Sequence, residues 1–217
     1  MKVINGYKYI LLFVFINEIN KDEKFMEKRI LDRTKFEYYW SYYLSIEKML
    51  KDTSRFVASS YENKNTYSDE FAKIILLSCS EIDSILKIIC KLKGVEKKDN
   101  EYNMKIYVQV LSEIEDIKEI AYSPYPSTYI DERSLIVFPF KKIDKNKKYG
   151  GLSWWNTYQA LKHNRLESAE KGNLYNAVSA VAAHYILMRT LIEFLYDYDG
   201  KEYVKEHNLS EYFIPCV

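Results

Sequence analysis

The sequence predicts an all-α protein, a helical bundle of four to five long helices with a small β-hairpin or an extended crossover inserted. Its 217 residues are enough for one hydrophobic core. Six glycines and four prolines are too few for an all-β protein. Apolar residues recur in steps of three and four over several long stretches, as in amphipathic helices. We therefore expect one helical domain over residues 35–217, preceded by a leader segment, residues 1–34, that packs on the domain or is partly ordered.

Charge and cysteine content narrow the class of protein. Thirty-two basic and 31 acidic residues leave a net charge of +1, so no global positive field attracts nucleic acid, and any RNA or nucleotide site must be local. The three cysteines, Cys79, Cys90 and Cys216, are an odd number without metal-ligand spacing. This pattern argues against a disulfide framework and a zinc site, and it favours the cytoplasm. We expect Cys79 and Cys90 to pack in the core.

The N-terminal segment contains an apolar run of eight residues, 9–16. A membrane-spanning helix needs roughly 20 apolar residues, so we expect no membrane partner. The polar residues that follow offer no small-residue cleavage site for a signal peptide. The run is interpreted as a strand or short helix packed on the domain, or as part of a leader ahead of an internal start at Met26.

Two long helices are expected in the first half of the chain. Periodicity predicts the first over residues 35–60. The second should be capped by Thr66 or Ser68 and end before Gly94. Glu81 lies on an otherwise apolar stripe of this helix, where an unpaired charge would be costly. We predict a buried ion pair between Glu81 and Arg165, with ordinary solvation of Glu81 as the alternative.

The middle of the chain should contain a third helix and the only β structure. Residues 102–120 have helical spacing. Residues 128–130 and 135–138 are short β-prone pieces between prolines, which predicts a hairpin or an extended crossover. Residues 141–151 form a basic segment, interpreted as a mobile loop that either binds phosphate groups or is simply solvated. The loop contains five lysines: Lys141, Lys142, Lys145, Lys147 and Lys148.

Residues 154–165 are the candidate site, because one predicted short helix, with Ser153 as its N-cap, carries three large aromatic residues and several polar groups. At 100° per residue, Trp154, Tyr158, Leu161 and Arg165 share one face. The opposite face presents neutral hydrogen-bonding groups around a histidine. The alternative is a bundle helix with core tryptophans and a solvated basic end. The candidate ligand-binding residues are Trp154, Trp155, Asn156, Tyr158, Gln159, Lys162, His163, Asn164 and Arg165.

Asn173 should open the last long helix. Its seam repeats in four-three steps, and its alanines form a second apolar surface, which predicts a homodimer. His184, among these alanines, is expected to be a core or interface histidine. The tail at residues 212–215 is expected to dock back as a clip. The seam residues are Leu174, Val178, Val181, Tyr185, Met188, Ile192 and Leu195, and the alanines are Ala177, Ala180, Ala182 and Ala183.

Four motifs carry a family resemblance: Thr66-Tyr67-Ser68-x-Glu70-Phe71, Ser80-Glu81-Ile82-Asp83, Trp154-Trp155-x-x-Tyr158-x-x-x-Lys162-His163-Asn164-Arg165 and Asn173-x-x-Asn176-Ala177. With these motifs, residues 35–196 of the chain resemble uncharacterised HEPN-like proteins of bacteria and prophages. The resemblance implies a helical, usually dimeric domain that binds RNA or nucleotides and acts in defence or anti-defence during phage infection. Many HEPN domains are metal-independent ribonucleases whose motif is an arginine followed four to six residues later by a histidine. No arginine stands in that position before His163 or His184.

Three functions are therefore considered. The first is binding of RNA or a small nucleotide-derived ligand without the usual ribonuclease motif, for example as a phage sponge for an immune nucleotide signal. The second is a metal-independent endoribonuclease, with His163 as general acid or base and Arg165 stabilising the phosphorane. The third is an inhibitor of a protein partner. No cofactor or metal is expected, because the sequence lacks a phosphate-binding glycine loop and HExxH and GxSxG motifs.

Overall fold

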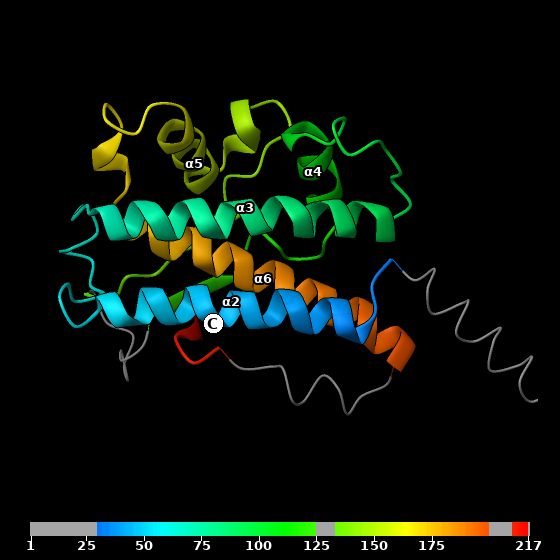
Figure 1. Cartoon of the computed structure of the whole chain (residues 1–217), viewed down its shortest axis with the longest axis horizontal. Helices are drawn as coiled ribbons and strands as arrows, with labels where there is room; N and C mark the ends of the chain where they lie inside the picture. The colour runs from blue at the N-terminus through cyan, green and yellow to red at the C-terminus, as the bar shows by residue number, and fades with distance from the viewer. Residues whose placement is uncertain (1–29, 125–132, 200–209, 217) are drawn as a thin grey trace, which may run out of the picture.

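The computed structural model describes residues 30–124, 133–199 and 210–216, with side chains described as far as residue 195 in the second range. The predicted mainly helical class is confirmed: three helices are long and two are short, and a two-stranded antiparallel sheet accompanies them (Figure 1). The predicted character of residues 1–29 lies outside the described residues. The elements in order are α2 (Arg33–Thr53), α3 (Asp69–Leu92), α4 (Met104–Leu111), β1 (Ala121–Pro124), α5 (Ser153–His163), α6 (Leu174–Asp199) and β2 (Phe213–Cys216), with 3-10 turns at Lys148–Gly151 and Ala169–Lys171.

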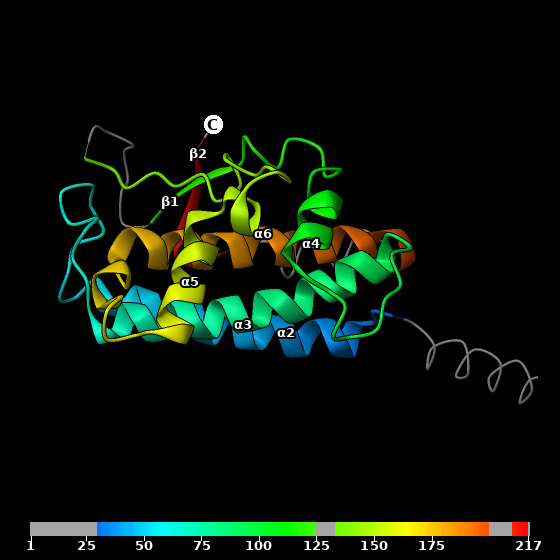
Figure 2. The ribbon, with the colours of Figure 1, turned by 90° about the horizontal axis from the view of Figure 1, so that it is seen from above.

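Helix α6 is the centre of the fold. It lies beside α2 and α3, while β1 and β2 lie on its other side (Figure 2). Every residue from Ala177 to Met188 is buried. Residues 174–195 have the length and mean hydropathy, 1.4, of a membrane span, but 83% of the most apolar window is buried inside the protein. The helix therefore serves as the core of the domain.

The burial of α6 removes the argument that predicted a homodimer. The four alanines are completely buried within one chain, and the heptad seam is buried too, because α2, α3 and α5 all pack against the helix. Sequence periodicity detected an apolar surface too wide for one neighbour, but several neighbours of the same chain cover it. A homodimer stays a prediction, without support from this surface.

The ends of α2 and α3 follow local capping chemistry. The side chain of Ser68 accepts from the amide of Phe71, 3.1 Å away, so one of the two predicted caps is confirmed. Gly94 follows α3 with a φ of 77°, a left-handed conformation that glycine adopts without strain. Helix α2 starts after the capping residue Asp32 and ends at Thr53 rather than at residue 60.

The described β structure joins two segments that are far apart in the sequence. Strand β1 pairs with β2 at the C-terminus, in the register Ala121 to Cys216 and Pro124 to Phe213. The tail therefore docks back as expected. Of the predicted β-prone pieces, residues 128–130 lie outside the described residues, and 135–138 contribute one bridge, between Val137 and Tyr122. The predicted hairpin or extended crossover stays a prediction, because its first piece is not described. The partner of β1 comes from a distant part of the sequence, which local pattern cannot reveal.

The third predicted helix is also shorter than expected. Helix α4 ends at Leu111, and turns with one bend continue to residue 119. Ile117 is buried although it lies in a turn, and Asp116 has a φ of 53°. The apolar residues keep helical spacing beyond the end of the helix because they anchor the turns to the core. Here an apolar residue is buried without being helical.

A buried carboxylate attaches the tail to α2. Glu47 is 2% exposed and accepts hydrogen bonds from the hydroxyls of Tyr43 and Ser210 and, at 3.2 Å, from the amide of Glu211. The hydroxyl of Tyr212 lies 2.7 Å from that of Ser59. Three donors satisfy the charge that burial would otherwise penalise. The C-terminal strand is therefore held by polar contacts at its start and by pairing with β1 along its length.

His184 is a core histidine, as predicted. Its side chain is completely buried, Nδ1 lies 3.4 Å from the Ser78 hydroxyl, and the ring of Tyr43 meets it edge-on at 5.2 Å. Nε2 has no hydrogen-bond partner within the described part of the chain. Burial lowers the pKa of His184 to about 3, because a charged imidazolium would lose its hydration.

This pKa predicts acid sensitivity. The unfolded chain binds a proton at His184 near pH 6.5 and the folded chain does not, so stability is complete above pH 6.5 and falls below it. Between pH 6.5 and 5 the free energy of unfolding should drop by roughly 2 kcal/mol from this residue. Urea unfolding of the wild type and of His184→Leu at several pH values measures the difference. His163→Leu, at an exposed histidine, is the control and should lose stability at acid pH as the wild type does. If His184→Leu loses as much stability as the wild type, the acid sensitivity does not come from His184.

Candidate functional site

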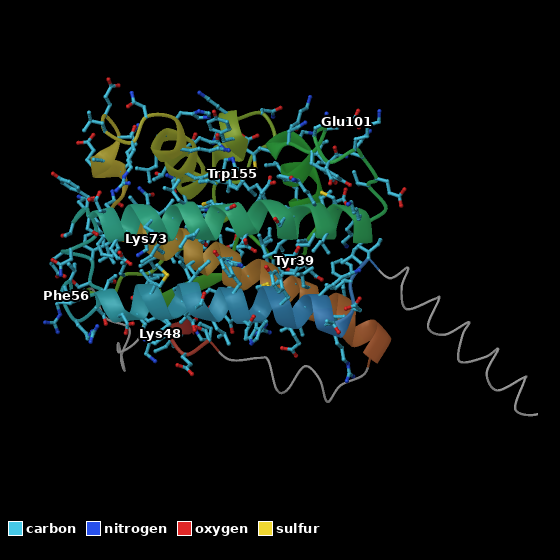
Figure 3. The ribbon with its side chains drawn as sticks, in the orientation of Figure 1. Tyr39, Lys48, Phe56, Lys73, Glu101 and Trp155 are labelled. Carbon is cyan, nitrogen blue, oxygen red and sulfur yellow. The ribbon has the colours of Figure 1, made fainter. Side chains whose placement is uncertain are left out.

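The two tryptophans of the candidate helix are core residues. Trp154 is completely buried, its Nε1 donates to the carbonyl of Pro139 at 2.9 Å, and its ring meets Phe140 edge-on at 5.9 Å. Trp155 is 5% exposed and lies beneath α5, on the side of α3 (Figure 3). A base cannot stack on a ring that is covered on both faces. Trp154 and Trp155 are therefore removed from the predicted ligand site, and the alternative interpretation, core tryptophans, is confirmed.

The start of α5 also differs from the prediction. The N-cap position is Leu152, Ser153 is the first helical residue, and no side chain caps the helix. The carbonyl of Leu152 instead accepts from the side-chain amide of Asn156 at 3.0 Å. The helix is placed by the burial of its tryptophans, with little contribution from capping.

The polar residues of α5 lie mainly at its exposed C-terminal end. Lys162 stands 5.6 Å from the ring centre of the half-buried Tyr158, and Gln159 is half-buried. His163 is exposed, and the amide of Asn164 donates to Glu167 at 2.6 Å. This arrangement resembles the solvated basic helix end that was the alternative in the sequence. These residues do not line any of three cavities formed by the described part of the chain, at the basic segment 141–147, between α6 and the turns after α4, and beside the end of α2.

Arg165 forms an ion pair with Asp69, not with Glu81. Its Nη2 lies 2.7 Å from the Asp69 carboxylate, and the two side chains are 56% and 91% exposed. The predicted buried pair is wrong because α5 ends at His163, so the helical angle of 100° per residue does not apply to Arg165. The chain leaves the helix and carries the guanidinium to the first turn of α3. An exposed pair of this kind contributes little to stability.

Glu81 follows the alternative interpretation, partial solvation at the edge of an apolar face. It is half-buried and forms no ion pair within the described residues. Burial raises the pKa of its carboxyl. Burial and then the nearby Glu81 charge raise the pKa of Tyr39, which lies between α2 and α3 (Figure 3). The neighbour of Glu81 is therefore Tyr39 of α2 and not the predicted Arg165.

A hollow at the basic segment after residue 140 is a stronger candidate for a binding site than helix α5. The hollow has a volume of about 560 Å³. We call it the lysine hollow. Most of its wall is the segment 141–151, which we call the lysine turn. Ser112 and Lys118, from the turns after α4, complete the wall, and neither was among the site residues predicted from the sequence. In the sequence, Lys118 is one lysine within the predicted helix 102–120, and no pattern there connects it to the basic segment. The lining residues are Ser112, Lys118, Lys141, Lys142, Ile143, Asp144, Lys145, Asn146 and Lys147.

Backbone hydrogen bonds give the lysine turn a defined conformation, where the sequence predicted a mobile loop. The amide of Asp144 donates to the carbonyl of Gly150 at 2.9 Å, and the amide of Lys147 donates to the carbonyl of Asp144 at 3.1 Å. The Asp144 side chain accepts from the amide of Asn146 at 2.9 Å. Gly150 has a φ of 68°, and a Cβ atom there would lie 2.3 Å from Cγ2 of Val108. The turn therefore packs directly on α4 through a glycine.

The electrostatics of the lysine hollow are strongly one-sided. Five lysines and one aspartate line it, which gives five minus one, or +4, in a chain whose net charge is +1. Asp144 pairs with Lys147 at 3.8 Å, and Lys141 lies 4.4 Å from the ring centre of Phe138. Lys118, Lys142 and Lys145 are exposed and form no ion pair within the residues that the structure describes. Three cations are thus available to a ligand.

Comparison with known proteins identifies no relative. No family model, no curated protein and no solved structure matches the chain.

Two glycine variants test how the lysine turn is built. Gly150→Ala should lower the free energy of unfolding by about 2 to 4 kcal/mol, because it adds a clash with Val108 to the strain of a positive φ. Gly94→Ala is the matched control, since its φ is 77° but no atom lies within 4 Å of the added Cβ. It should lower stability by only about 1 kcal/mol. Urea unfolding midpoints measure both, and equal losses would mean that the turn does not pack on α4 as described.

Proposed function

We propose that the protein binds a phosphate-bearing ligand, RNA or a small nucleotide derivative, at the lysine hollow. The observation that carries this proposal is the convergence of three lysines from two separate segments on one hollow, where none of them forms an ion pair with another described residue. Lys142 and Lys145 come from the lysine turn, and Lys118 comes from the turns after α4. Phosphate groups are neutralised by such lysines, with release of counterions. Because the whole chain is nearly neutral, the attraction would be local to this hollow.

Aromatic residues near the hollow support a nucleotide over a simple anion. Phe138 and Tyr149 are half-buried, and lysines approach their rings, Lys141 at 4.4 Å and Lys148 at 5.0 Å from the ring centres. Base stacking on an aromatic ring, combined with cationic contacts to phosphate, is a common basis for binding single-stranded nucleic acid. These two rings replace the buried tryptophans in our proposal.

We propose further that the protein is HEPN-like and acts in phage–host conflict, as a binder without the usual ribonuclease motif. The support is the sequence resemblance in α5 and α6 together with a mainly helical fold. One form of this function is a sponge that sequesters an immune nucleotide signal. A cytoplasmic location would accompany it.

The ribonuclease and inhibitor hypotheses stay predictions. Helix α5 ends at His163, which allows His163 and Arg165 to face one phosphate, but Arg165 is already paired with Asp69. An exposed ion pair breaks easily, so the pairing of Arg165 with Asp69 does not exclude catalysis, and an activity assay is needed. The test is incubation with labelled RNA in EDTA, in which cleavage abolished by His163→Ala would support catalysis. An inert wild type would exclude it.

The binding proposal predicts a salt-dependent loss in a triple variant. Fluorescence anisotropy with a short labelled single-stranded RNA should show weaker binding by Lys118→Ala/Lys142→Ala/Lys145→Ala, by roughly tenfold to a hundredfold at low salt. The slope of log affinity against log salt should fall by about 2, since each contact to single-stranded nucleic acid contributes roughly 0.7. Cyclic dinucleotides and ADP-ribose derivatives as competitors would separate a nucleotide ligand from RNA.

A matched variant controls for net charge. Lys48→Ala/Lys73→Ala/Lys97→Ala removes three positive charges from α2, from α3 and from the loop after α3, away from the hollow; Figure 3 marks Lys48 and Lys73. It should bind with nearly the wild-type affinity and slope. Equal losses in the two triple variants would show that binding follows overall charge, and no binding of any phosphate compound by the wild type would refute the proposal.

A further inference from the structure

A second cavity, separate from the lysine hollow, lies between α6 and the turns after α4. Its volume is about 350 Å³. Helix α6 contributes Ile186, Arg189, Thr190 and Glu193, which lie on one face at spacings of three and four residues. The other wall consists of residues 114–116 and 120 and of Tyr122 in β1. We call this the Arg189 cavity.

Arg189 is the first residue after the fully buried stretch of α6. It is half-buried and makes no hydrogen bond or ion pair within the described part of the chain. Glu193 lies one turn further along the helix, the usual position for a partner, yet the two do not pair. A guanidinium has five donors, and partial burial without acceptors is unfavourable. This arginine is therefore available to an acceptor that enters the cavity.

Tyr122 offers a second donor to the same cavity. The residue is 8% exposed, and its hydroxyl has no hydrogen bond within the residues that the structure describes. Its ring is held by Tyr185 at 5.2 Å and Phe213 at 5.9 Å between centres. Burial raises its pKa to about 12, although the charge of Arg189 acts in the opposite direction, so the hydroxyl keeps its proton. A phenol and a guanidinium from two residues that line one cavity match the two oxygens of a carboxylate.

The rest of the lining restricts the ligand further. Glu115, Asp116 and Glu193 are exposed and unpaired within the described residues, so the cavity carries three negative charges against one positive charge, or −2. This balance repels a phosphate or a dicarboxylate and attracts an ammonium group. Three isoleucines provide an apolar wall: Ile114, Ile120 and Ile186.

We propose that the Arg189 cavity binds a small zwitterion with an apolar side chain, an aliphatic α-amino acid. Arg189 and Tyr122 bind its carboxylate, the carboxylates at the rim bind its ammonium group, and the isoleucines contact its side chain. A volume of about 350 Å³ is at the lower end for ligand pockets and suits one small molecule. The inference stands on other residues than the proposed phosphate site and does not depend on it.

Isothermal titration calorimetry with L-leucine, L-isoleucine and L-methionine tests the proposal on the wild-type chain. At least one should bind when titrated to about 10 mM, which detects millimolar dissociation constants. Two analogues divide the chemistry: leucine methyl ester lacks the carboxylate, and 4-methylpentanoate lacks the ammonium group. Both should bind at least tenfold more weakly than leucine. The absence of heat with all three amino acids, or equal binding of 4-methylpentanoate, would overturn the proposal.

Variants assign the binding to this cavity. Arg189→Met keeps an unbranched stem on α6 and should weaken binding at least tenfold. Tyr122→Phe keeps the ring and should weaken it about fivefold, the effect of one hydrogen bond. Arg55→Met, at an exposed arginine beside Phe56, is the control and should bind like the wild type. Near-UV circular dichroism verifies folding, and if Arg189→Met fails to fold, Tyr122→Phe decides. Unchanged affinity in the folded variants would place any binding elsewhere and refute the assignment.

Discussion

The burial of α6 on all sides is the constraint on which the rest of the structure depends. Twelve consecutive residues, 177–188, are buried, and an exposed helix of that composition would leave a large apolar surface in water. Helices α2 and α3 cover one side, α5 adds its tryptophans, and the sheet of β1 and β2 covers another side through Tyr122 and Phe213 packed on Tyr185. The C-terminal strand therefore belongs to the core structure, and Glu47 fixes its start.

This use of apolar surface explains why the tryptophans are not binding residues. Large aromatic side chains stabilise a fold most when they are fully buried, and α5 has only 11 residues with which to attach itself to α3 and α6. Trp154 and Trp155 supply that attachment. The chemistry available to ligands is left to the irregular segments, where charged groups can remain hydrated until a ligand arrives.

Periodicity and capping residues in the sequence predicted those parts of the fold that depend on neighbours along the chain. The Ser68 cap, the end of α3 before Gly94 and the buried seam of α6 all follow from residues close together in the sequence. Prediction failed where an element ended early or a partner was distant. Because α5 ends at His163, Arg165 does not lie on the helix face expected for it. Strand β2 pairs with a strand about ninety positions away in the sequence. Lys118 joined the lysine hollow through tertiary packing, for which the sequence carries no periodic signal.

The early end of α4 gives the two proposed sites their form. Ser112 and Lys118 line the lysine hollow, whereas Glu115 and Asp116 line the Arg189 cavity, so one short segment contributes to two hollows of opposite charge. On a continuous helix, Ser112, Glu115 and Asp116 would share a face, because they are three and four residues apart. The turns separate them, and buried Ile117 anchors the segment between them. The departure from regular helix geometry thus places opposite charges in different hollows. Sequence rules for regular structure tend to fail at functional positions, and this segment fits that tendency.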